Sequence, residues 1–105
     1  MAVIAMVTYD VSGWPEEFRE EMMTLRWTYS RDGQQLPRST CLTFFNQAPM
    51  RDAQQVLTIV KKQIIAARDA VRGKHDKTFY IERFSVALFD GDTAVLDGFG
   101  EPDKQ

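Results

Sequence analysis

The chain begins with an apolar run, residues 3–9, that ends on the carboxylate of Asp10. Alternate residues of this run fall on two faces that are both largely apolar, a pattern typical of a central strand covered on both sides. Residues 12–14 then break the strand, and Pro15 suits the first turn of a helix. Four glutamates within residues 16–21 place negative charge near the positive end of that helix. The pattern therefore predicts a strand followed by a helix.

Two further strands are predicted in the middle of the chain. The first covers residues 26–31, with Trp27 and Tyr29 on one face, and the second covers residues 38–45. The Asp-Gly pair at residues 32–33 is a turn signal that separates them.

The second half of the chain predicts a long helix and then more strand. Apolar residues recur at intervals of three and four over residues 50–72, which indicates one buried helix face, and Gly73 is the expected C-terminal stop. Residues 78–89 are rich in strand-forming residues. Their alternation slips near Glu82 and Arg83, which indicates a bulge or a strand break.

A turn at residues 90–92 leads to a last strand over residues 93–96. The order is therefore β-α-β-β-α-β with an extra C-terminal strand. Two helices on one face of an antiparallel sheet predict an α+β, ferredoxin-like sandwich. Residues 1–97 are expected to form a single ferredoxin-like domain and residues 98–105 a flexible tail. Because an open sheet edge must be covered or paired, we expect a homodimer.

Composition limits the functions that are open to the chain. Its 105 residues, 44% of them apolar, suffice for one core without disulfides or a structural metal. The net charge of −2 argues against a broad nucleic-acid footprint but leaves room for a local basic patch. The single cysteine, Cys41, lies in a strand-like run and is expected to fill the core, and the single histidine, His75, lies in a polar linker. No apolar run predicts a signal peptide or a spanning helix, so we expect a cytoplasmic protein with no membrane role.

Asp10 is the leading candidate for chemistry. A carboxylate at a strand end can hold Mg²⁺ or Mn²⁺, with its counterpart in a second subunit supplying another carboxylate. Ser12 would then place water or phosphate. The alternative is that Asp10 caps the loop before the helix and that Ser12 belongs to a turn. Three further aspartates lack the glycine position and the terminal glutamate of a calcium loop: Asp90, Asp92 and Asp97. A hairpin turn explains the Asp90-Gly91 pair.

Arginines near aromatic residues are candidates for RNA contact. Arg26 and Arg31 flank Trp27 and Tyr29, and Arg38 follows a proline. Such groups can hold single-stranded nucleic acid by ion pairing and base stacking. The alternative is that both aromatic residues face the core while the arginines point to water.

The strand end over residues 7–12, with its Tyr9-Asp10 pair followed directly by a helix, resembles the small CRISPR-associated protein that bridges the spacer-integration complex. It also resembles the related ferredoxin-like proteins, including the type V antitoxin that cleaves its toxin's messenger RNA. The element order matches to about Leu96. The resemblance implies that Asp10 is a metal ligand and that two copies meet at a dimer interface. The CRISPR-associated members carry an arginine-rich first helix, whereas here only Arg19 is basic. This difference favours the antitoxin-like ribonuclease or a member of the group without catalysis.

Two functions therefore stay open. The first is a metal-dependent endoribonuclease with an antitoxin-like or regulatory role, in which Asp10 and Ser12 are catalytic and Arg26, Arg31 and Arg38 contact RNA. The alternative is a non-catalytic dimeric protein-interaction module, such as a regulator or a phage-encoded inhibitor. The acidic first helix and the lack of a catalytic constellation in the sequence favour this alternative.

Overall fold

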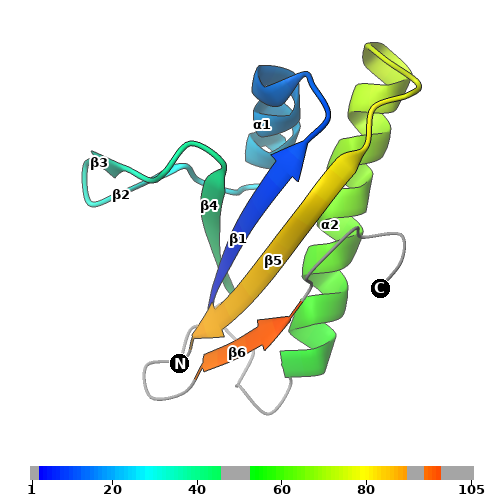
Figure 1. The fold of residues 1–105 in the computed structure, drawn as a ribbon. Helices are drawn as coiled ribbons and strands as arrows, with labels where there is room; N and C mark the ends of the chain where they lie inside the picture. Colours follow the sequence, from blue (N-terminus) through cyan, green and yellow to red (C-terminus); the bar gives the residue numbers. More distant parts are fainter. Residues whose placement is uncertain (1–2, 46–52, 90–93, 98–105) are drawn as a thin grey trace.

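The computed structural model describes residues 3–45, 53–89 and 94–97 of the chain. They form an α+β fold with two α-helices and a four-stranded sheet (Figure 1). In chain order the elements are β1 Val3–Val11, α1 Pro15–Thr24, β2 Ser30–Arg31, β3 Gln34–Gln35, β4 Thr40–Phe45, α2 Ala53–Lys74, β5 Ile81–Phe89 and β6 Ala94–Asp97.

The sheet has the order β4-β1-β5-β6, and the neighbouring strands are antiparallel. β1 is central, as the sequence predicts, because it pairs with β4 on one side and with β5 on the other. β2 and β3 form a separate two-stranded ribbon that projects from the sheet (Figure 1).

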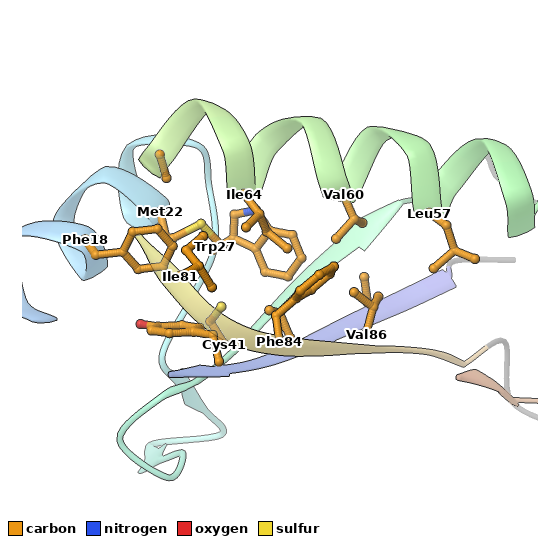
Figure 2. Packing of buried hydrophobic residues seen from close by; sticks show 14 of the residues in the cluster. Phe18, Met22, Trp27, Cys41, Leu57, Val60, Ile64, Ile81, Phe84 and Val86 are labelled. Carbon is orange, nitrogen blue, oxygen red and sulfur yellow. The ribbon is translucent and has the colours of Figure 1, made fainter. Parts of the chain in front are cut away.

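Both helices contribute to one core on a single face of the sheet. Phe18 and Met22 come from α1, and Val60 and Ile64 come from α2 (Figure 2). All four are at most 1% exposed, and the ring of Phe18 packs edge-on against Tyr9 with 4.8 Å between the ring centroids. Burial of such side chains contributes about 1.5–3 kcal/mol each, so this core is the main source of stability.

The prediction that β1 is covered on both faces is wrong for the described part of the chain. The odd-numbered residues from Val3 to Tyr9 are buried beneath the helices, whereas Ile4 and Met6 are partly exposed and Thr8 is exposed. Phe44 of β4 and Phe89 of β5 share this second face, with 47% and 36% of their surface exposed. We call it the open face. The apolar pattern of β1 could not show that both helices occupy the same side.

The predicted strand over residues 26–31 is much shorter in the structure. Arg26 has a φ of 73°, in the left-handed region, and this turns the chain out of an extended path. Only Thr28 then bridges to β4, through two 2.8 Å backbone hydrogen bonds with Leu42. Trp27 and Tyr29 are 3% and 5% exposed, which confirms the alternative that they face the core.

Other boundaries follow the sequence more closely. α1 begins at Pro15 as predicted, whereas α2 runs through Gly73 to Lys74 instead of stopping at the glycine. The predicted bulge is confirmed, because β5 pairs Arg83 with Asp10 and then Ile81 with Val11, which leaves Glu82 without an opposite residue. The start of the long helix before residue 53, the turn at residues 90–92 and the predicted tail lie outside the described residues.

Candidate functional site

Two adjoining cavities lie where β1 ends, and together we call them the strand-end groove. The first has a volume of about 280 Å³, and Asp10 is among its lining residues. The second has a volume of about 300 Å³, and Tyr29 is among its lining residues. They form one groove because both are lined by the same three charged residues: Glu16, Arg19 and Arg38.

Backbone pairing brings the parts of this groove together. The amide of Tyr9 donates a 3.1 Å hydrogen bond to the carbonyl of Ser39, and the amide of Thr40 donates to the carbonyl of Pro37 at 2.9 Å. These bonds hold the segment before β4 against the end of β1. Arg38, which is remote in sequence from Asp10, therefore lines the same cavity.

Asp10 forms an ion pair with Arg83, which lies opposite it on β5. Its carboxylate accepts a hydrogen bond from Nε of Arg83 at 2.5 Å, and the two side chains are 50% and 74% exposed. The hydrogen bond and the negative charge of Asp10 raise the pKa of Arg83 above its usual range. The hydrogen bond is made to Oδ2 of Asp10, so the other carboxylate oxygen can meet a further ligand while this exposed and therefore weak pair persists.

The two groove arginines are held in different ways. Arg38 lies 3.7 Å from a carboxylate oxygen of Glu16, and their side chains are 83% and 61% exposed, so this pair too is weak. Arg19 places its guanidinium over the ring of Tyr29, 4.7 Å from the centroid. This cation–π contact fixes the direction of Arg19 without neutralising its charge.

The carboxylates of the groove suit a divalent cation whose remaining ligands are water and substrate phosphate. Asp10 and Glu16 both line the first cavity. Among the described residues no group of three or more His, Cys, Asp or Glu side chains could hold a metal, so these residues do not make a closed protein cage. Mg²⁺ is commonly bound by only one or two carboxylates together with water and substrate phosphate. The donor set is therefore suitable for Mg²⁺ or Mn²⁺.

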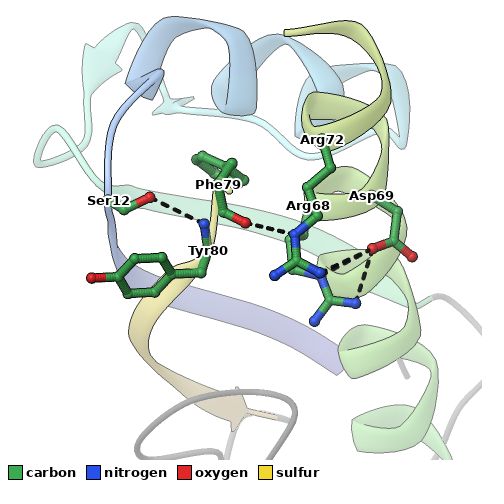
Figure 3. Close-up of polar contacts among 6 residues, drawn as sticks. All are labelled: Ser12, Arg68, Asp69, Arg72, Phe79 and Tyr80. Carbon is green, nitrogen blue, oxygen red and sulfur yellow. Dashed lines mark hydrogen bonds and ion pairs between the residues drawn. The ribbon is translucent and has the colours of Figure 1, made fainter. Parts of the chain in front are cut away.

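Ser12 is occupied by a structural contact. Its hydroxyl accepts a 3.0 Å hydrogen bond from the amide of Tyr80, and its own amide donates to the carbonyl of Tyr80 at 3.0 Å (Figure 3). This exchange ties the loop after β1 to the segment before β5. Ser12 is not among the residues that line either cavity, so the structure does not bring it together with Asp10 in the groove.

The structure also separates the three arginines singled out from the sequence. Arg38 lines the groove, but Arg26 and Arg31 line neither cavity. Arg31 instead lies over the ring of Phe44, 5.5 Å from its centroid, beside the open face. Arg19 is the groove cation that the sequence reading missed as a site. The available signal was its position three residues after Glu16, which puts both side chains on one face of the helix.

A buried polar cluster lies beneath the groove. The hydroxyls of Tyr9 and Tyr29 are 2.6 Å apart and hydrogen bonded. Burial raises the pKa of Tyr9 to about 12 and that of Cys41 to about 12, and it raises the pKa of Tyr29 further still. The Cys41 thiol is therefore protonated at neutral pH, and its burial confirms that it fills the core.

His75 stacks on Trp14 at the surface, with 4.9 Å between the ring centroids.

No family model, curated protein or solved structure matches the chain. The resemblance drawn from residues 7–12 therefore stays a prediction. Within the described ranges, neither helix is long and apolar enough to cross a membrane.

Proposed function

We propose that the chain is a metal-dependent endoribonuclease with an antitoxin-like or regulatory role in the cytoplasm, and that it acts at the strand-end groove. One observation carries the proposal: two carboxylates, Asp10 and Glu16, and two guanidinium groups, Arg19 and Arg38, line a single cavity. Carboxylates suit a hard divalent cation, and guanidinium groups bind phosphate through paired hydrogen bonds.

Each residue of the groove has a role in this proposal. Asp10 and Glu16 would hold the ion. When bound, the ion would polarise a phosphate oxygen and lower the pKa of its water, which supplies the nucleophile. Arg38 and Arg19 would bind the phosphate oxygens and position the scissile bond. Arg83 orients the Asp10 carboxylate through their hydrogen bond.

RNA as the substrate rests on the resemblance and on the shape of the groove. A cavity of about 280 Å³ has room for about one nucleotide, which favours a single strand over a duplex. The net charge of −2 also disfavours the long phosphate tracks that duplex binding requires.

The test is cleavage of an end-labelled single-stranded RNA and of a DNA duplex by purified protein with Mg²⁺, Mn²⁺ or EDTA. We expect cleavage of the RNA with either ion, none in EDTA, and an intact duplex. If the RNA stays intact with both ions, the proposal is wrong.

We also propose that the architecture is ferredoxin-like, with its outer strand reduced to the bridge between Thr28 and Leu42. Support comes from the central position of β1 between β4 and β5 and from the two helices on one face. In this interpretation β6 is the extra strand at the opposite edge.

The open face favours a second candidate function, a dimeric interaction module. Ile4, Met6, Phe44 and Phe89 present apolar surface there. With strands about 4.8 Å apart and about 3.3 Å per residue, the face has a footprint of roughly 500 Å². Two copies packed face to face would bury an area comparable with the smaller specific interfaces. We propose that the occupant is a second copy of the chain, which makes the protein a homodimer.

Phe44→Ser is expected to weaken this dimer at least about tenfold, because it removes about 1.5–3 kcal/mol of apolar burial from each subunit. Sedimentation equilibrium at several concentrations measures the dissociation constant. Ile59→Ser is the matched control, because Ile59 is a similarly exposed apolar residue, 43% exposed, on α2. A wild-type protein that stays monomeric, or equal effects of the two substitutions, would contradict this interface.

A further inference from the structure

We infer that the second cavity of the strand-end groove is a nucleobase subsite, which receives the base of a nucleotide whose phosphate lies against Arg38. The inference rests on the proposed function for its ligand class, since it assumes that the groove receives RNA. It goes further by assigning the part of the groove that lies away from Asp10. Base binding needs no metal and no cleavage, so the two proposals can be tested separately.

The lining of the second cavity differs chemically from that of the first. Asp10 is not among its lining residues, which instead include Tyr29, Gln35 and Leu36. A primary amide offers two donors and an acceptor on one plane, which matches the neighbouring donor and acceptor groups on the edge of a nucleobase. Aromatic and aliphatic side chains provide the apolar walls that a flat ring requires.

Local backbone structure holds these side chains in place. The amide of Leu36 donates a 2.9 Å hydrogen bond to the carbonyl of Tyr29, and Gln35 pairs with Ser30 across the β2–β3 ribbon. Tyr29 is 5% exposed and its hydroxyl is bound to that of Tyr9 at 2.6 Å, so the wall it forms is anchored in the core. The cavity is therefore attached to the rigid part of the fold.

The boundary between the two cavities suits a phosphate. Arg19 and Arg38 line both of them, and the exposed Glu16 at 3.7 Å is the acidic partner of Arg38. An RNA phosphodiester carries one negative charge, and its two free oxygens can accept paired charge-assisted hydrogen bonds from the guanidinium of Arg38. Since the exposed pair between Arg38 and Glu16 is weak, the phosphodiester can displace Glu16. The guanidinium of Arg19, which lies over the ring of Tyr29 at 4.7 Å from its centroid, is also a planar group on which a base can stack.

The size of the cavity is consistent with one nucleotide. Its volume of about 300 Å³ lies at the lower limit of small-molecule sites. A single base with its phosphate at the boundary fits this space, and only an unpaired base leaves its edge free to contact Gln35. The subsite therefore selects an unpaired nucleotide, which would explain a preference for single strands.

The test is calorimetric titration in EDTA of the full chain with three probes: the nucleoside 5′-monophosphates, ribose 5-phosphate and inorganic phosphate. We expect at least one mononucleotide to bind about tenfold tighter than ribose 5-phosphate. Gln35→Ala should weaken that mononucleotide about fivefold and leave ribose 5-phosphate unchanged. Arg38→Gln should weaken every phosphate probe about tenfold, in line with the loss of a charge-assisted pair.

Matched controls separate a specific loss from a general one. Gln34→Ala alters the neighbouring exposed glutamine of β3, which does not line the cavity, and Lys62→Gln removes an exposed cation of α2. Both should bind like wild type. The inference is overturned if ribose 5-phosphate binds as tightly as every mononucleotide, if Gln34→Ala and Gln35→Ala behave alike, or if no mononucleotide binds. Nucleotide binding without RNA cleavage in Mg²⁺ would sustain the subsite while refuting the ribonuclease.

Discussion

Asp10→Asn is expected to lower metal-dependent RNA cleavage by at least about 100-fold, because a carboxylate that helps to hold the ion supplies several kcal/mol of transition-state stabilisation. The amide keeps the size of the side chain but loses the negative charge that attracts the cation. The fold should persist, since Asp10 is exposed and its pair with Arg83 is a surface pair. Cleavage rates at saturating Mn²⁺ measure the effect.

Asp32→Asn is the matched control for this substitution. Asp32 is 91% exposed, lies 3.7 Å from Arg31 and lines neither cavity of the groove. Asparagine also tolerates its φ of 52°. The control should cleave like wild type. Equal rates for Asp10→Asn and wild type would exclude Asp10 as a metal ligand, and weaker Mn²⁺ binding by Asp10→Asn in EPR titrations would support the role independently of turnover.

The second large effect expected is loss of stability in alkali. Tyr9 and Cys41 have pKa values raised to about 12 in the folded protein, and the pKa of Tyr29 is raised as well. The unfolded chain releases the thiol proton above pH 9 and the tyrosine protons above pH 10, whereas the folded chain retains them to about pH 12. Stability is therefore complete below pH 9 and falls as the pH rises.

The size of this fall follows from proton linkage. For each proton that the folded chain retains and the unfolded chain has released, the free energy of unfolding falls by about 1.4 kcal/mol per pH unit. By pH 11 the three groups together remove on the order of 5 kcal/mol, which is comparable with the whole stability of a small domain. Urea unfolding curves collected from pH 8 to pH 11 measure the change.

Cys41→Ala tests the assignment to the buried cluster. The variant starts from a lower stability because the core loses a sulfur atom, so the informative quantity is the pH at which stability begins to fall. That onset should move from about pH 9 to about pH 10, because only the tyrosines then titrate. A wild-type protein whose stability is constant from pH 8 to pH 11 would show that these groups do not remain protonated in the folded state.

The structural features that could be predicted correctly are those set by residues close to one another in the sequence. The start of α1 follows from Pro15. The first amide of a helix has no acceptor within the helix, so proline loses no hydrogen bond there, and its fixed φ suits the helical conformation. The bulge near Glu82 can be predicted because Ile81 and Phe84 are both apolar although they are three positions apart, a spacing that places them on opposite faces of a regular strand. Asp10 at the end of β1 follows in the same way, since the apolar run stops there.

The groove depends on contacts that no local pattern contains. Arg83 meets Asp10 only because β5 pairs with β1 in a particular register, and that register is set across 73 positions of the chain. Arg38 and Arg19 come together because the segment before β4 folds against α1. Arg26, Arg31 and Arg38 are all predicted to contact RNA from their neighbours in the sequence. Tertiary packing places only Arg38 in the groove.

The bulge in β5 also determines where the chain tolerates a change in length. Loss of Glu82 alone would leave Arg83 opposite Asp10 and Ile81 opposite Val11, because Glu82 has no opposite residue in β1. Loss of one residue anywhere between Phe84 and Leu88 would instead turn exposed positions toward the helices. The ion pair between Asp10 and Arg83 should therefore survive the deletion of Glu82. It should be lost when a residue is deleted from the far half of β5, because that deletion shifts the register.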